Sequence, residues 1–492
     1  MLTSRLSVIL ALSIGTALLF SIEPAHAGDL SALKRCLLHD VRKTRSVPAR
    51  CGQLTVPENY AEPNGAKVEL FVAVIPARSK TPAPDAVTAI AGGPGGASTD
   101  DYVNWGRSTF VDILKKRDII LVDQRGTGGS KRFDCPFDPD AMIDATPEEI
   151  KAANKACLDA FSGDARFYTT TEAVKDLEAV RTALGYEQLN VYGVSYGTRV
   201  ALEYLRRYPQ KVRTIVLDGV APADLALGPG IPLAAQEALD SIFARCTDDQ
   251  QCRERYPNIA ADFKRLHHRL TDEPVKVDYR DPQSGVRKTT MLTAEKLAGV
   301  VRLMSYDSLY ASLIPLAIDR AANEEDFASL AAQFAMVQGN LSGALAMGMH
   351  ASVVCTEDVP FIDPNVELTT LDRTYMGRRM VTALQAGCED WPRGTLPDDF
   401  KQPVSSDRPA LLLSGSADPV TPPSHAVRAQ ENLSNARHIV VPDHGHGMAR
   451  LRCVSRMITK FIETADITTP DEKCLADQPP APFFTSPTGA AP

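Results

Sequence analysis

Seven short apolar runs recur along the chain, and their character predicts the strands of one sheet. They span residues 68–77, 86–93, 118–126, 189–195, 212–220, 409–415 and 438–445. Most of the later runs are apolar almost without interruption, as strands buried on both faces are. Segments such as 171–185 and 196–209 lie between them, carry apolar residues at helical spacing, and end at a glycine and a proline. Strands alternating with helices predict an α/β fold with a mostly parallel sheet.

The strand pattern lapses over residues 221–400, where the apolar positions follow helical spacing instead. We therefore expect a core in two parts, 28–220 and 401–475, separated by a mainly helical insertion. Such an insertion would lie as a lid over the carboxyl ends of the strands, where α/β sheets bind their ligands. The Pro- and Ala-rich end, 476–492, is expected to be disordered.

The first 27 residues have the features of a signal peptide. Arg5 precedes an apolar run over 6–22, and Ala25 and Ala27 supply small residues for cleavage. The run is close to the shortest that can span a bilayer, so a retained anchor is the alternative. We expect signal removal, no stable membrane insertion afterwards, and export to a bacterial periplasm or the medium.

The ten cysteines all follow this segment, and an even number in an exported chain indicates disulfides. Because short loops close easily, we expect neighbours to pair: Cys36–Cys51, Cys135–Cys157, Cys246–Cys252, Cys355–Cys388 and Cys453–Cys474. The chain has no Cys-x-x-Cys and no His-Glu-x-x-His, so no metal or other cofactor is expected. A formal net charge of −8 argues against a nucleic-acid partner.

Ser195 stands at the centre of Gly-x-Ser-x-Gly, with a predicted strand before it and a predicted helix after it. This context makes a sharp turn that exposes the serine hydroxyl and directs a helix N-terminus at the reacting atoms. An ordinary turn serine is the alternative, but the flanking elements favour a nucleophile.

A serine nucleophile needs a base, and the base needs an orienting carboxylate. Asp418 follows the run 409–415, and His444 and His446 follow "HIVVPD" (438–443). All three come after strand ends, at the sheet edge where Ser195 is expected. Spacing alone does not distinguish His444 from His446.

Other acidic and histidine residues fit the roles less well. Asp407 precedes its strand and would lie at the opposite sheet edge, and Asp443 fits a turn. His425 is expected on a helix surface, and His267 and His268 occur in a polar stretch of the insertion.

Acyl transfer also requires two donors for the oxyanion. One should be the amide of Tyr196, which begins the helix after the serine. The glycine-rich stretch "AIAGGPGGAS" (89–98) can supply the other, since glycines let the backbone approach a carbonyl closely. We choose Gly93, with Gly92 and Gly95 as alternatives.

Five short motifs together resemble the prolyl aminopeptidase family of α/β-hydrolases, and most closely its secreted tripeptidyl-aminopeptidase-like branch. They are "GGPGG" (92–96), "DQRGTGGS" (123–130), "GVSYG" (193–197), "ADPVTP" (417–422) and "GHG" (445–447). The resemblance covers about residues 36–475.

Carried onto this sequence, the resemblance implies Ser195 as nucleophile, Asp418 as acid and His446 as base, and so favours His446 over His444. It also implies that Asp123 and Arg125 brace loops around the site. Many prolyl aminopeptidases have histidine before "GGPG", whereas this chain has Ala91, so a preference for proline is not implied.

The family cleaves peptides near a free amino terminus, so a carboxylate should receive the substrate ammonium. Glu357, and less favoured Asp358, stand where the insertion returns to the core, although they could also be solvated charges. We expect an exported serine aminopeptidase acting on short peptides through an acyl-enzyme. A carboxylesterase on the same fold and, more remotely, a non-catalytic binding protein are the alternatives.

Overall fold

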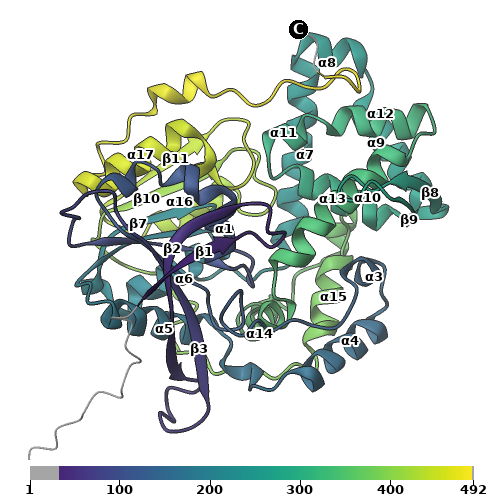
Figure 1. Cartoon of the computed structure of the whole chain (residues 1–492). Helices are drawn as coiled ribbons and strands as arrows, with labels where there is room; N and C mark the ends of the chain where they lie inside the picture. The colour runs from purple at the N-terminus through teal and green to yellow at the C-terminus, as the bar shows by residue number, and fades with distance from the viewer. Residues whose placement is uncertain (1–32, 490–492) are drawn as a thin grey trace, which may run out of the picture.

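The computed structural model describes residues 33–489, so the predicted signal peptide lies outside the described residues. A nine-stranded sheet, seen on the left of Figure 1, forms the centre of the core, with the strand order β1-β2-β3-β5-β4-β6-β7-β10-β11. The strands are β1 (Lys34–His39), β2 (Ser46–Pro57), β3 (Lys67–Ile75), β4 (Ala86–Ile90), β5 (Ile119–Val122), β6 (Leu189–Val194), β7 (Val212–Asp218), β10 (Ala410–Gly415) and β11 (Ala436–Val441).

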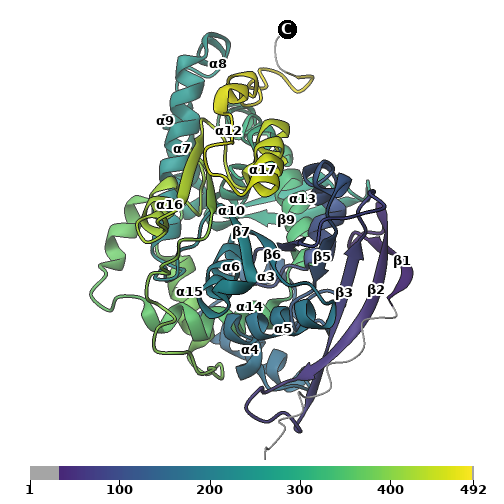
Figure 2. The ribbon, with the colours of Figure 1, turned by 90° about the vertical axis from the view of Figure 1, so that its left-hand side faces the viewer.

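Neighbouring strands from β5 to β11 pair in parallel, so the predicted α/β fold with a mostly parallel sheet is confirmed. The seven predicted runs overlap the strands β3 to β7, β10 and β11, and the first and last runs begin one residue after the start of β3 and two after the start of β11. The antiparallel strands β1 and β2, at the sheet edge in Figure 2, were not among them. Buried and exposed residues alternate along much of β2, and polar or charged residues interrupt its apolar run.

Helices cover both faces of the sheet because alternate strand residues point to opposite sides. Leu412 belongs to the hydrophobic cluster under α5 (Thr170–Ala183), α6 (Tyr196–Arg207) and α16 (Pro423–Gln430). Its neighbours Leu411 and Leu413 belong instead to the cluster under α17 (Arg452–Thr464). The short helices α1 (Ser98–Asp101) and α2 (Arg107–Thr109) follow β4 and lie before β5.

The segment predicted to form a lid lies between β7 and β10 in sequence and to the right of the sheet in Figure 1, and we refer to it as the lid. It has its own hydrophobic cluster and a two-stranded antiparallel hairpin that the predicted helical pattern did not include. Its elements are α7 (Gly230–Asp248), α8 (Gln250–Arg255), α9 (Ile259–Asp272), β8 (Val275–Arg280), β9 (Arg287–Leu292), α10 (Ala294–Met304), α11 (Ser308–Ala311), α12 (Ile314–Asn323), α13 (Ala328–Ala344), α14 (Met347–Glu357) and α15 (Arg379–Cys388).

The structure divides the chain less cleanly than the sequence pattern suggests. Helices α3 (Pro139–Ile143) and α4 (Pro147–Ala160), from the first part of the core, pack beside α15 of the lid. The Arg379 side chain donates to the carbonyls of Ile143 and Ala145 across this contact.

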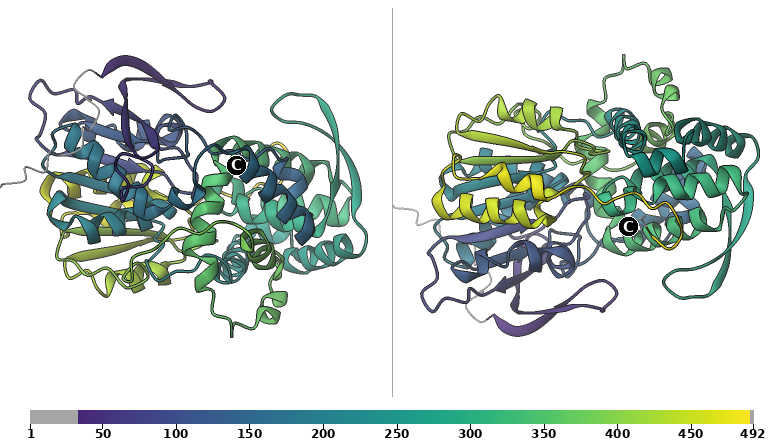
Figure 3. Two further views of the ribbon diagram at one scale, coloured as in Figure 1. Left: turned by 90° about the horizontal axis from the view of Figure 1, so that it is seen from below. Right: turned by 90° about the horizontal axis from the view of Figure 1, so that it is seen from above.

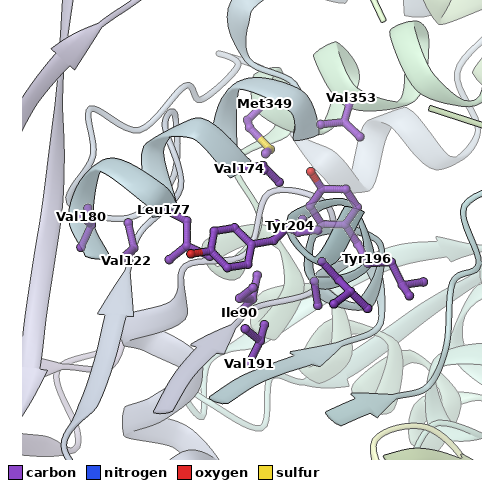
Figure 4. Close-up of a cluster of buried hydrophobic side chains, with 14 of the residues drawn as sticks. Ile90, Val122, Val174, Leu177, Val180, Val191, Tyr196, Tyr204, Met349 and Val353 are labelled. Carbon is purple, nitrogen blue, oxygen red and sulfur yellow. The ribbon is translucent and has the colours of Figure 1, made fainter. Parts of the chain in front are cut away.

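Helix α14 is a second exception to the predicted division. It lies within the predicted insertion in sequence, but it packs into the hydrophobic cluster of the core. Figure 4 shows Met349 and Val353 of α14 gathered with Tyr196 of α6 and Val174 of α5. The lid is therefore joined to the helix that follows Ser195 by a shared hydrophobic cluster.

Residues 476–489 of the C-terminal segment, which the sequence analysis expected to be disordered, pack against the rest of the molecule. After the turn Glu472–Asp477 the chain crosses from the core to the lid, as the view from above in Figure 3 shows. Phe483 is buried in the lid cluster under the Arg245 guanidinium, whose carbon lies 4.2 Å from the ring centre. The Phe484 amide donates to the Ser312 carbonyl over 3.1 Å. An aromatic anchor thus orders a stretch whose composition resembles a disordered tail.

Five disulfides join the neighbouring cysteines that the sequence analysis paired, and no free cysteine occurs among the described residues. They fit an exported protein. Within residues 33–489, no helix is both long enough and apolar enough to cross a membrane.

Candidate active site

Ser195 occupies the single residue between β6 and α6, in the sharp turn that the motif predicted. Its φ of 56° and ψ of −128° lie in a region that non-glycine residues seldom occupy. Its amide donates to the Asp218 carbonyl over 2.9 Å, and its carbonyl accepts from the Thr198 amide over 2.8 Å. Backbone bonds to a strand and a helix thus hold the turn in place.

The two glycines of the motif are required by close approach of backbone atoms. A Cβ added at Gly193 would lie 2.3 Å from the Gly197 carbonyl oxygen. A Cβ added at Gly197 would lie 2.4 Å from the Ile90 oxygen. Any side chain at either position would push α6 away from the sheet.

Asp418 and His446 form a direct pair beyond the ends of β10 and β11. His446 Nδ1 lies 2.7 Å from Asp418 Oδ2, and Asp418 is almost fully buried. The amides of Val420 and Thr421 donate to Asp418 Oδ1, each over 2.9 Å. Since Nδ1 faces the carboxylate, Nε2 is the imidazole nitrogen that can act on Ser195. Ser195 and His446 both line one large cavity.

Most of the other candidates lie elsewhere. His444 is buried, with Nδ1 2.8 Å from the Pro442 carbonyl, and Asp443 occupies an exposed turn with a φ of 56°. Asp407 is exposed before β10. His425 was expected on a helix surface, but the structure corrects this: it is half-buried on α16 and lines the cavity with His446.

The glycine-rich loop after β4 lies against the serine. A Cβ added at Gly92 would approach Ser195 Cβ to 2.8 Å, and Gly93 has a φ of 120°. Gly95 lies against the lid, because its carbonyl accepts from the Ala346 amide over 2.9 Å. Tyr196 begins α6, so its amide has no acceptor within the helix.

The two charged residues of "DQRG" hold the loops near this site, in line with the bracing role implied by the resemblance. Asp123 is buried and accepts from the amides of Thr99 and Gly129, each over 3.0 Å. Arg125 is buried and makes two 2.7 Å bonds to the Asp176 carboxylate. Neither residue lines the large cavity at Ser195.

Glu357 is fully buried and does not line the cavity. It accepts from the Thr170 amide over 2.6 Å and from the Thr170 hydroxyl over 2.7 Å. The same hydroxyl lies 2.7 Å from the Tyr196 hydroxyl. Burial raises the pKa of Glu357 to about 7. The Glu357 carboxylate is therefore linked through Thr170 to the first residue of the helix after Ser195 and lies outside the cavity.

Asp358 does line the cavity, but its carboxylate already has partners. Arg199 donates to Oδ1 over 2.7 Å and to Oδ2 over 3.1 Å, and the Leu227 amide donates to Oδ1 over 2.9 Å. Of the two carboxylates predicted to receive the ammonium, Glu357 thus lies outside the cavity and Asp358 is paired with Arg199.

A cavity of about 1070 Å³ lies between the core and the lid and contains the predicted nucleophile and base. Several of its lining residues had no recognisable signal in the sequence, because they belong to the lid helices or to strand ends. They include Asp218, Arg302, Tyr306 and His350.

Asp218, at the end of β7, supports the loop that carries His446. It accepts from the Met448 amide over 2.7 Å, the Ala449 amide over 2.8 Å and the Tyr192 hydroxyl over 2.8 Å. Burial raises its pKa above the usual aspartate range. Within residues 33–489, no three His, Cys, Asp or Glu side chains gather as ligands for a metal ion.

Comparison with known proteins agrees with this architecture. A family model described as the alpha/beta hydrolase fold matches residues 87–290, and one described as TAP-like protein matches residues 373–474. The tripeptidyl aminopeptidase of Streptomyces coelicolor is 25% identical over 480 residues, covering 88% of this chain and 84% of that protein.

Two further similarities are more limited. The serine protease Hip1 of Mycobacterium tuberculosis is 27% identical over 259 residues, covering 47% of each chain. The solved proline iminopeptidase of Mycobacterium smegmatis is 17% identical with a TM-score of 0.41, covering 85% of this chain and 99% of that one. The two family models, the near full-length relative and the parallel sheet together show that the chain has the α/β-hydrolase fold and is similar to tripeptidyl aminopeptidases.

Proposed function

We propose that the protein is an exported serine aminopeptidase that releases short peptides from free N-termini, acting in a bacterial periplasm or the medium. The observation that carries the proposal is the 2.7 Å pair of His446 and Asp418 in the cavity that Ser195 lines. The similarity to a tripeptidyl aminopeptidase over most of the chain supports the substrate class.

In the first half-reaction Ser195 Oγ attacks the scissile carbonyl carbon while His446 Nε2 takes the hydroxyl proton. Asp418 orients the imidazole and stabilises its charged form. The amides of Tyr196 and Gly93 donate to the oxyanion of the tetrahedral intermediate. His446 then passes the proton to the leaving nitrogen as the carbon–nitrogen bond breaks, which leaves the acyl group on Ser195.

In the second half-reaction water attacks the acyl ester and gives a proton to His446. The ester bond to Ser195 breaks, Oγ recovers the proton, and the released fragment leaves as a free acid. No cofactor takes part in this sequence of steps.

A carboxylesterase is the second candidate because the same residues would cleave an ester. One observation favours it: the two carboxylates expected to bind a substrate ammonium are held by Thr170 and Arg199. A binding protein without activity is the remote third candidate. Binding alone would not require the paired Asp418 and His446.

Four chromogenic substrates distinguish these functions: Ala-Ala-Pro-anilide, its N-blocked form, Pro-anilide and a short-chain nitrophenyl ester. We expect hydrolysis of the free tripeptide anilide, little or none of its blocked form, and loss of activity in Ser195→Ala. Ester turnover with neither tripeptide anilide cleaved would replace the peptidase with an esterase. Activity retained in Ser195→Ala would reject both enzymes as described.

A further inference from the structure

The loop that carries His446 is in direct contact with the lid. The His446 amide donates to the main-chain carbonyl of Tyr306 over 2.8 Å. Tyr306 follows α10, in the turn before α11, so a residue of the inserted lid supplies the acceptor. This bond joins the predicted base to a part of the chain that contributes no residue to the acid–base pair.

Gly445 makes the contact close. A Cβ added there would lie 2.3 Å from the Ser305 carbonyl oxygen and 2.6 Å from the Tyr306 carbonyl oxygen. Ser305 is itself buried, and its hydroxyl donates to the Val301 carbonyl over 2.8 Å. The lid turn and the histidine loop therefore touch backbone to backbone, with no space for a side chain.

The Tyr306 ring then packs on the imidazole itself. The two ring centres lie 5.1 Å apart with the planes at 66°, an edge-to-face arrangement. Arg302, one turn earlier on α10, donates to the Tyr306 hydroxyl over 2.8 Å and holds that ring in place. Tyr306 and His446 both line the cavity.

These contacts add a further restraint on His446 to those from Asp418 and Asp218. Asp418 fixes Nδ1, and Asp218 fixes the loop after His446 through the Met448 and Ala449 amides. Tyr306 accepts from the amide of His446 through its carbonyl and packs its ring against the imidazole.

We propose that Tyr306 is a positioning residue for His446, so that the base is correctly oriented only while the lid turn is seated against it. This inference rests on the proposed role of His446 as the base. It assigns the lid a part in the chemical step as well as in covering the cavity. A displacement of about 1 Å at a reacting group can lower a rate about 10²-fold, so loss of this support should affect kcat.

The test compares Tyr306→Leu, which removes the ring, with Tyr306→Phe, which keeps it and loses only the bond from Arg302. Tyr279→Leu, on β8 of the lid and away from the cavity, is the matched control. The readouts are kcat and KM on the nitrophenyl ester and the tripeptide anilide, their pH profiles, and the low-field NMR resonance of the His446–Asp418 proton.

We expect Tyr306→Leu to lower kcat by about 10- to 100-fold with a much smaller change in KM. The acidic limb of the pH profile should move and the low-field resonance should broaden, because the imidazole is less well held. Tyr306→Phe should restore most of kcat, and Tyr279→Leu should resemble the wild type. Charged groups near the imidazole are Asp418, Asp218 and Arg302, and all three are unchanged in these variants.

Gly445→Ala tests the same contact from the core side, and it remains informative if Tyr306→Leu fails to fold. A folded Gly445→Ala protein should show the same fall in kcat and the same loss of the resonance. The inference is overturned if a folded Tyr306→Leu or Gly445→Ala protein keeps kcat, its pH profile and the resonance, with only KM altered. His446→Ala separates the two proposals, since activity retained there would reject the proposed function itself.

Discussion

Asp100 is a cavity-lining carboxyl group whose surroundings oppose its ionisation. Burial, and then repulsion from Asp123, raises its pKa from 3.8 to about 7. Between about pH 4 and pH 7 the folded protein therefore binds more protons at this position than the unfolded chain, so stability falls as pH rises.

We accordingly expect Asp100→Asn to unfold at a higher temperature than the wild type at pH 8, with the difference vanishing near pH 4. Thermal unfolding measured across this pH range tests the prediction, with Asp248→Asn at an exposed position of α7 as the control. An equal shift in melting temperature at both pH values would contradict it.

Glu357 shows how far a single residue can be interpreted without tertiary contacts. A carboxylate near a disulfide, where an insertion returns to the core, fits a substrate site as well as a structural one. Only the structure shows that Thr170 occupies both of its oxygens and that the cavity lies elsewhere. Its hydrogen-bond partner, Thr170, lies 187 positions away in the chain, so no local sequence pattern indicates this contact.

At the scale of elements, the turn between β6 and α6 depends on the absence of a side chain at Gly197. In Gly197→Ala the new methyl group would overlap the Ile90 and Ala91 carbonyls, so α6 must move off the sheet. We expect a loss of roughly 1–3 kcal/mol in the free energy of unfolding and a marked loss of activity.

Gly299→Ala in α10 is the matched substitution, because a Cβ there meets nothing within 4 Å. It should stabilise the protein by about 1 kcal/mol, as alanine does in a helix interior. Urea unfolding of both variants measures the contrast. Comparable unfolding midpoints for the two would show that the close approach at Gly197 is unimportant.

The contact between α6 and the end of α14 rests on a buried ion pair. Arg199 and Asp358 are 4% and 1% exposed, and two hydrogen bonds of 2.7 and 3.1 Å join them. Without the Asp358 charge, the buried Arg199 keeps only the Glu357 carboxylate, 3.5 Å away, as a counter-charge. Breaking a buried ion pair costs about 3–5 kcal/mol.

Asp358→Asn should therefore lower the free energy of unfolding by several kcal/mol in a urea titration. Asp224→Asn breaks an exposed pair with Arg428, where both side chains are more than 40% exposed, and should cost at most about 1 kcal/mol. If Asp358→Asn and Asp224→Asn lower the free energy of unfolding equally, the buried Arg199–Asp358 pair does not stabilise the contact between α6 and α14.

At the scale of the whole molecule, the C-terminal segment connects core and lid. Cys453–Cys474 ties the start of this segment to α17, and Phe483 is only 5% exposed within the lid cluster. Phe483→Ala should weaken that anchor by about 3 kcal/mol, the usual cost of removing a buried aromatic ring.

Because the ring packs under Arg245, hydrogen exchange should accelerate in α7 and in residues 478–489, and much less in the central strands. Phe361→Ala, at a ring that is 46% exposed, is the control. Unchanged exchange in α7 would mean that the segment does not hold the lid.

Much of the core could be predicted from the sequence. The runs that became β4 to β7 and β10 are buried almost throughout, so they are largely apolar and easily recognised. The edge strand β1 and its neighbour β2 expose part of their surface and were missed. The hairpin β8–β9 was missed for the same reason, since only Val277 and Leu292 are buried in it.

The sequence by itself determined the parallel sheet and the turn at Ser195, and it predicted an acid at Asp418 and a base at His444 or His446 after the last two strands. Each depends on local patterns: buried strands, glycines beside a serine, and the rule that parallel strands end at one edge. The tertiary structure alone decided what surrounds these residues. It brought Tyr306 against His446, kept Glu357 out of the cavity and anchored Phe483 in the lid, because each of these contacts joins side chains or carbonyls that lie far apart in the chain.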